Sequence, residues 1–345
     1  MIKLHPSTKT LICIGSGGVG KTTMAASIAV GLANAGKKIL VLTIDPSLRL
    51  AQALGIKTDG DLHRVTLPSG KGELWSCIID HKKTFDWFIE NAAGHTDVSS
   101  LLENRLYQQL SGRLSGSQEF TSLLALQRFV SSGMYDLVIL DTPPSQHTWS
   151  FLRAPEKISA LFNEGVASWF RSSSGAGTSL FKKVLNMGTA QVLKALEMLT
   201  GSHFMKELSA FFQAIQKWQG PLENYVMSCH RILVSHETEF LLVTSLDSSR
   251  INEAQKLSRE IQKQGYRLTS VIVNRIPKWI SEPQQMGSAR VSEMLGYYQS
   301  LENDLQIRLT QLRFSLKVYK CFELRQNIED VKSLQSNYES ISPLS

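Results

Sequence analysis

Near its N-terminus the chain reads Gly15-Ser16-Gly17-Gly18-Val19-Gly20-Lys21-Thr22-Thr23. This stretch matches the phosphate-loop pattern G-x-x-x-x-G-K-[ST], also called Walker A. The fixed positions are Gly15, Gly20, Lys21 and Thr22. The glycines let the backbone adopt positive φ angles and bring its N–H groups against an anion. We predict that the stretch binds nucleotide, with Lys21 at the β- and γ-phosphates and the Thr22 hydroxyl on Mg²⁺.

The sequence on either side of the loop supports this prediction. Residues 10–14 form a short apolar run typical of a buried strand, and residues 24–35 predict a helix that ends at Gly36. Strand, glycine loop and helix thus occur in the order that places a bound phosphate at a helix N-terminus. These flanks disfavour the alternative, a glycine-rich turn that binds nothing.

Composition limits the class of protein. With 345 residues, 42% of them hydrophobic, the chain is large enough for one large α/β domain or two small ones. The net charge of +7 is spread along the chain without a basic block, so we expect no nucleic acid partner. No signal peptide and no apolar run of about 20 residues are present, and the four cysteines lie far apart. We therefore expect a cytoplasmic protein with free thiols.

Two further strands are predicted to end in aspartate. Residues 38–44 form a continuous apolar run before Asp45 and Pro46, and a carboxylate at a strand end is well placed for chemistry in an open parallel sheet. Asp45 is thus a candidate to orient the water that attacks a γ-phosphate; alternatively, it only caps the turn before Pro46. The predicted strand at residues 135–140 is followed by Asp141, which we predict to hold Mg²⁺ directly or through water. His147 then lies where a γ-phosphate-sensing loop belongs, or is simply a packed histidine.

The remaining pattern predicts the architecture. Strands are also predicted at residues 74–79, 240–244, 268–274 and 314–319, with helices between most of them. This alternation predicts a P-loop NTPase of the α/β class, with a doubly wound, mainly parallel sheet flanked by helices and an added α-helical subdomain. Asn274, at the end of its predicted strand, offers a paired donor and acceptor suited to a base edge.

We divide the chain into three parts. Residues 1–150 and 237–345 form the two halves of the ATPase domain, and residues 151–236 form the helical subdomain. Apolar stripes and several methionines in that subdomain suit the binding of apolar helices, so it is the candidate client and dimer region. The alternative is that these stripes pack on each other as core.

Four blocks of sequence occur together in one known family: residues 15–23, 43–48, 141–155 and 271–275. With them the chain resembles the arsenite-pump (ArsA-type) ATPases. That family includes the eukaryotic ATPases of the guided-entry pathway, which target tail-anchored membrane proteins. The likeness covers nearly the whole chain, in a single copy rather than a tandem pair, and residues 199–212 are similar to bacterial members.

The resemblance implies roles for the residues named above. Lys21 and Thr22 bind the phosphates and Mg²⁺, and Thr23 lies near the α-phosphate. The first switch contains Asp45, Pro46 and Arg49, the second runs from Asp141 to His147, and Asn274 contacts adenine. The family works as homodimers that close with ATP and open with ADP, and closure builds a hydrophobic groove for a client.

Three departures from the family pattern qualify this picture. The family has a second lysine directly after the first glycine of the loop, which reaches the partner's nucleotide; here that residue is Ser16. Loss of a cation supplied in trans costs on the order of 10³-fold in rate, unless Arg49 replaces it. The chain also lacks a Cys-x-x-Cys pair, so no zinc site is expected. Its separated cysteines argue against arsenite as a cargo.

These observations favour a cytoplasmic Mg²⁺-dependent ATPase that dimerises on ATP and handles a hydrophobic client or a membrane transport partner, at times at the membrane surface. Ser16 keeps open a second function, a nucleotide-gated binding module with little turnover. A positioning ATPase on membrane or DNA would need a terminal amphipathic anchor or a basic patch, and neither is evident. A small-molecule kinase is less favoured, because nothing in the sequence specifies a phosphate acceptor.

Overall fold

The computed structural model describes most of the chain outside residues 155–218. The described residues are 2–44, 48–68, 70–92, 102, 118–142, 151–154, 219–277, 289–312, 316–324 and 327–344. They fall into two compact units, one of residues 1–80, 125–152 and 231–345, the other of residues 81–124 and 153–230. The role assigned to residues 151–236 stays a prediction, because residues 155–218 lie outside the described part of the chain.

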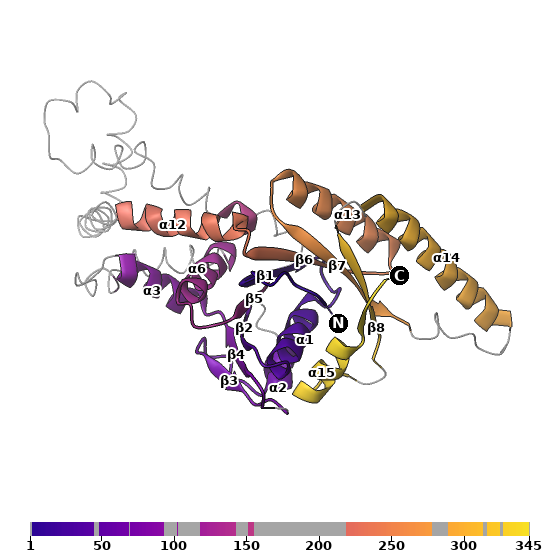
Figure 1. The fold of residues 1–345 in the computed structure, drawn as a ribbon, viewed down its shortest axis with the longest axis horizontal. Coiled ribbons are helices and arrows are strands. Elements are labelled where there is room, and N and C mark those ends of the chain that lie inside the picture. The colour runs from indigo at the N-terminus through magenta and orange to yellow at the C-terminus, as the bar shows by residue number, and fades with distance from the viewer. Residues whose placement is uncertain are drawn as a thin grey trace, which may run out of the picture. The chain divides into compact units, whose positions relative to one another are not determined.

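The first unit is built on one sheet, which contains nine strands in the described part of the chain, in the order β3-β4-β2-β5-β1-β6-β7-β8-β9 (Figure 1). The strands are β1 Thr10–Gly15, β2 Lys38–Thr43, β3 His63–Val65, β4 Glu73–Ile78, β5 Leu137–Asp141, β6 Thr238–Ser245, β7 Leu268–Ile276, β8 Lys317–Phe322 and β9 Ile341–Pro343. The described helices of the chain are α1 Lys21–Asn34, α2 Leu48–Leu54, α3 His81–Ala92, α6 Gln118–Ser131, α12 Gln219–Val234, α13 Ser248–Lys263, α14 Ala289–Leu312 and α15 Val331–Glu339.

The interior of the sheet is parallel, as predicted. Strands β4, β2, β5, β1, β6, β7 and β8 pair in parallel, whereas β3 and β9 pair antiparallel at the two edges. The inner strands read as continuous apolar runs because helices cover both of their faces; every residue of β1 is buried. The prediction missed both edge strands and placed β8 three residues too early.

Helices cover the two faces of the sheet (Figure 1). Alternate strand residues such as Leu11, Ile139 and Ile272 form one core with α1 and α15. The residue next to Ile272, Val273, faces the other way and packs with Ile251 of α13. Since successive side chains of a strand point to opposite faces, these two cores lie on opposite sides of the sheet. This is the doubly wound arrangement that the sequence predicted.

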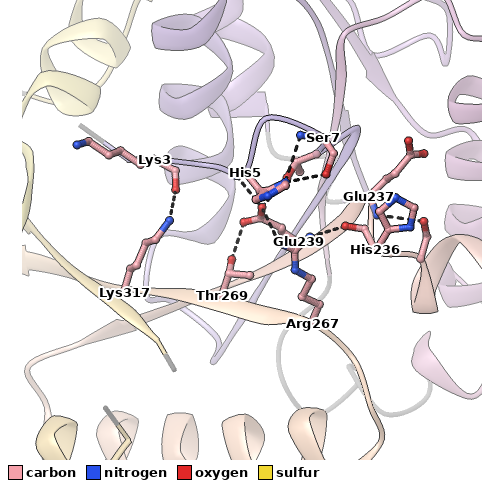
Figure 2. Close-up of polar contacts among 11 residues, drawn as sticks. Lys3, His5, Ser7, His236, Glu237, Glu239, Arg267, Thr269 and Lys317 are labelled. Atoms are coloured by element: carbon pink, nitrogen blue, oxygen red, sulfur yellow. Dashed lines mark hydrogen bonds and ion pairs between the residues drawn. The ribbon is translucent and has the colours of Figure 1, made fainter. Parts of the chain in front are cut away.

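A buried carboxylate fastens the N-terminal segment to the amino ends of the strands (Figure 2). Glu239 Oε1 accepts hydrogen bonds from the His5 N–H at 2.8 Å and the Thr8 hydroxyl at 2.5 Å, and Oε2 accepts one from Thr269 at 2.6 Å. Arg267 lies 4.0 Å from Oε1. The carboxylate side chain is only 2% exposed, so these bonds replace its lost hydration.

The second unit holds α3 together with parts of α6 and α12. Its described core contains an aromatic cluster in which the Phe88 ring packs edge to face against the rings of Phe120 and Tyr225. The ring centroids lie 5.7 and 5.6 Å from that of Phe88. Cys229 is buried beside Leu123 in the same unit. Among the described helices, none combines the length and the apolar character that crossing a bilayer requires.

Candidate nucleotide site

The phosphate loop leaves the sheet at the centre of its carboxyl edge. It follows β1, which lies between β5 and β6, and it runs directly into α1. Gly15 ends β1 so close to β6 that a Cβ atom there would overlap the Val243 carbonyl. Crevices at this edge, where the connections turn to opposite sides of the sheet, are where open α/β sheets bind ligands. The fold therefore places the predicted loop where its chemistry requires it.

Lys21 lies in the first turn of α1 and is buried. Its Nζ donates a hydrogen bond to the Ser16 carbonyl at 2.9 Å, so the side chain folds back over the loop. An ammonium group carries three donors, so the bond to Ser16 does not by itself prevent a contact with a phosphate. Ser16 and Val19 are both buried, whereas Gly17 is half-buried and Gly18 is exposed.

Three elements converge on the Asp141 carboxylate. Asp141 is the last residue of β5, and its Oδ2 accepts hydrogen bonds from Thr22 Oγ1 at 2.5 Å and from Thr43 Oγ1 at 3.0 Å. Thr22 comes from the start of α1 and Thr43 from the end of β2, the neighbour with which Asp141 is in register. Hydroxyl and carboxylate oxygens of this kind are the ligands that Mg²⁺ prefers. The structure thus brings the predicted metal ligands Thr22 and Asp141 together.

The residue after Asp141 is fixed to β1. Both the N–H and the hydroxyl of Thr142 donate to the Cys13 carbonyl, at 3.2 and 2.7 Å. Burial raises the pKa of the Cys13 thiol far above its usual range, and the nearby Asp141 carboxylate raises it further, although Lys21 opposes this. The thiol is therefore protonated near neutral pH and is a poor metal ligand. All four cysteines are buried and free, as the sequence predicted.

Asn274 contacts the phosphate loop. Its Nδ2 donates to the Val19 carbonyl at 2.9 Å, and its Oδ1 accepts from the Arg275 N–H, also at 2.9 Å. The sequence predicted that strand to end at Asn274, but β7 continues to Ile276. The difference arises because Arg275 adopts φ +59° and β7 pairs with β8 again beyond this irregularity. The side chain is buried, with 6% exposed.

Several predicted residues are not placed. Asp45, Pro46 and His147 lie outside the described residues. For Arg49, only the backbone is described, in the first turn of α2. Thr23 is half-buried in the first turn of α1.

Sequence reasoning missed Thr43 and the loop contact of Asn274. A polar residue that ends an apolar strand was the available signal for Thr43. Its partner became visible only once the strand order placed β2 beside β5. The Val19 carbonyl carries no signal in the sequence, because every residue offers the same backbone group.

A central parallel sheet with this loop, helix and acidic strand end defines a P-loop nucleotide-binding protein. The ArsA_ATPase family model, described as an anion-transporting ATPase, matches residues 8–306. The chain belongs to this family and is an ATPase.

Curated relatives agree with this assignment. ATPase GET3 of Candida glabrata is 28% identical over 300 residues, which cover 80% of this chain and 77% of the relative. ATPase GET3 of Kluyveromyces lactis is 34% identical over 163 residues, 44% of this chain and 46% of the relative. ATPase get3 of Aspergillus niger is 25% identical over 280 residues, 80% of this chain and 76% of the relative.

Proposed function

We propose that this ATPase is a Mg²⁺-dependent homodimeric switch, which couples its nucleotide state to the handling of a hydrophobic client or a membrane transport partner. Family membership supports the coupling, and one observation supports the nucleotide chemistry. That observation is the convergence of Thr22 and Thr43 on one buried oxygen of Asp141, beside the phosphate loop. Such a cluster supplies oxygen ligands where the β- and γ-phosphates of a P-loop protein lie.

Thr22 and Asp141 are the residues that would hold Mg²⁺, Asp141 through a water molecule. The fit is chemical: all of their contacting atoms are oxygens, which match a hard cation. When bound, Mg²⁺ would neutralise the charge that develops on the phosphate oxygens. Thr43 would keep the Asp141 carboxylate in its present orientation.

The residues of the loop would stabilise the transferred phosphoryl group. Lys21 would move from the Ser16 carbonyl toward the phosphates or bridge both, and the loop N–H groups would surround the phosphate oxygens. Asp45 would orient the attacking water, and Asn274 would contact adenine. ADP would then release the switches and reopen the dimer. Each of these roles can be tested by substituting the residue that would perform it.

The dimer and its client are tested together. The expected result is a more compact dimer with a non-hydrolysable ATP analogue than with ADP, by small-angle X-ray scattering after size-exclusion chromatography. Residues 151–236 would build the client surface, and the described end of this range exposes Met227. A helical client in the cytoplasm, delivered at the membrane surface, should co-purify with the closed form. A dimer with the same radius of gyration in both nucleotides would reject the switch.

Ser16 favours a second function, a binding module that binds nucleotide but hydrolyses it slowly. The ATPase rates of the wild type and Ser16→Lys separate the two. A rise on the order of 10³-fold with lysine supports the attenuated module, because it restores the cation that the family pattern supplies. Brisk turnover by the wild type rejects it. Ser16→Thr is the matched control, since it retains a hydroxyl and adds no charge.

A further inference from the structure

Asn274 makes a contact that base recognition does not require. Its side chain comes from β7, the second strand from the loop, and it reaches the Val19 carbonyl. The orientation of its amide is determined by both partners. Val19 offers only a carbonyl oxygen and Arg275 offers only an N–H, so Nδ2 must face the loop and Oδ1 must face Arg275.

The backbone of Arg275 keeps the amide in this orientation. Arg275 is the only residue other than glycine with a positive φ in the described part of the chain, at +59°. Its N–H, which belongs to the peptide that joins it to Asn274, donates the 2.9 Å bond to the Asn274 side chain. A residue in this sparsely populated region persists only where its surroundings hold it. The Asn274 amide is thus held before it meets the loop.

The contact also fixes the peptide between Val19 and Gly20. A peptide bond is planar and trans, so the Gly20 N–H points opposite to the Val19 carbonyl and therefore away from Asn274. Gly20 is in the left-handed conformation, with φ +88° and ψ +29°, directly before α1. A Cβ atom there would lie 2.5 Å from Asn274 Nδ2, so the asparagine occupies the space that the glycine leaves.

We propose that Asn274 is a positioning residue for the phosphate loop. By holding the Val19 carbonyl, it presents the Gly20 N–H to the phosphates. This role rests on the proposed nucleotide chemistry but is separate from any contact with adenine. The amide retains one N–H and one lone pair for a base edge, so one side chain would connect base recognition to loop geometry.

A ligand without a base separates the two roles. We would measure by calorimetry the binding of magnesium tripolyphosphate and of MgATP to the full chain and to Asn274→Ala. Loss of loop positioning should weaken tripolyphosphate binding by about tenfold, because one buried hydrogen bond that orders the site is lost. A contact with adenine alone would weaken only MgATP. Asn274→Thr, which suits a strand but is too short to reach Val19, should behave like the alanine variant.

Asn337→Ala is the matched control. Asn337 is also buried, and its Nδ2 donates to Ser27 of α1 at 2.9 Å, farther along the helix from the loop. It should lower the melting temperature without weakening tripolyphosphate binding. Equal tripolyphosphate affinity in the wild type and both Asn274 variants would overturn the positioning role. Absence of any nucleotide or tripolyphosphate binding by the wild type would instead reject the proposed function.

Discussion

The Thr22 hydroxyl lies 2.5 Å from Asp141 Oδ2, and it joins the first turn of α1 to the end of β5. The two residues are 119 positions apart in the sequence. Thr43 donates to the same oxygen, so this one atom connects the phosphate loop with two neighbouring strands. The Asp141 carboxylate therefore joins three elements of the fold, and it is also the predicted Mg²⁺ ligand.

Asp141→Asn should reduce ATP turnover by at least about a hundredfold, because the amide keeps the shape of the side chain but removes its charge. One amide oxygen still accepts from Thr22, so the fold should persist. We would measure phosphate release at saturating ATP across a series of Mg²⁺ concentrations. The Mg²⁺ concentration that gives half of the maximal rate should be higher for the variant than for the wild type.

Asp136→Asn is the control for this change. Asp136 directly precedes β5 at its other end, where its Oδ2 accepts from the Lys38 N–H at 2.7 Å. It should leave turnover and Mg²⁺ dependence unchanged. If Asp141→Asn matched the wild type in both, Asp141 would have no part in metal binding.

Gly31→Ala should destabilise the first unit by about 1–3 kcal/mol, because small-to-large changes overpack a filled core. Gly31 lies on α1 against the Tyr338 ring of α15, and a Cβ atom there would overlap the ring. Urea unfolding measures the loss. In a Tyr338→Ala background the cost of Gly31→Ala should vanish, whereas in a Tyr338→Phe background it should remain. A cost that is equal in all three backgrounds would show that the ring is not its cause.

Much of the fold could be predicted because its inner strands carry a local signal. A strand inside a sheet that is covered on both faces, such as β1 or β5, is buried at every position and apolar over most of its length. Edge strands carry no such signal: β3 is His63-Arg64-Val65, and its pairing with β4 depends on tertiary structure. The irregular end of β7 was likewise invisible, because it depends on the backbone angle of Arg275.

The candidate site likewise contains residues that the sequence could predict and contacts that it could not. The loop and Asp141 could be predicted because each is a local pattern, a glycine motif or an acid after an apolar run. Thr43 and the Asn274 contact could not be, because they depend on which strands are neighbours and on the direction of one carbonyl group. Patterns in sequence thus identified the groups that carry charge, and the structure identified the groups that orient them.

Arg49→Ala should reduce turnover on the order of 10³-fold if this arginine supplies the cation that Ser16 cannot. Arg49 belongs to the predicted first switch and is the second residue of α2, which begins at Leu48. Turnover is measured by steady-state phosphate release, and dimer closure by small-angle X-ray scattering with a non-hydrolysable ATP analogue. Arg64→Ala, on edge strand β3 where the arginine pairs with Glu73, serves as the control and should have no effect. Unchanged turnover and closure in Arg49→Ala would reject this role.

Glu239→Gln should lower the free energy of unfolding at neutral pH by about 2 kcal/mol. Both carboxylate oxygens accept hydrogen bonds, whereas a glutamine amide would place an NH₂ donor group opposite one set of these donors. Burial raises the pKa of Glu239, but the bonds from Thr269, Thr8 and the His5 N–H outweigh this, so its pKa lies below the ordinary value of 4.5. Urea unfolding at several pH values measures the effect.

The sign of the pH dependence follows from this lowered pKa. The stabilisation by Glu239 is fully present above pH 4.5, where the carboxyl is ionised in the unfolded chain as well, and it is lost as the pH falls through the folded pKa. The difference between wild type and Glu239→Gln should therefore shrink below pH 4.5. Glu237→Gln is the control. Its carboxylate pairs with Lys9 at the surface, so its loss should matter much less at any pH. A difference between wild type and Glu239→Gln that stayed constant into the acid range would show that ionisation of Glu239 does not contribute to stability.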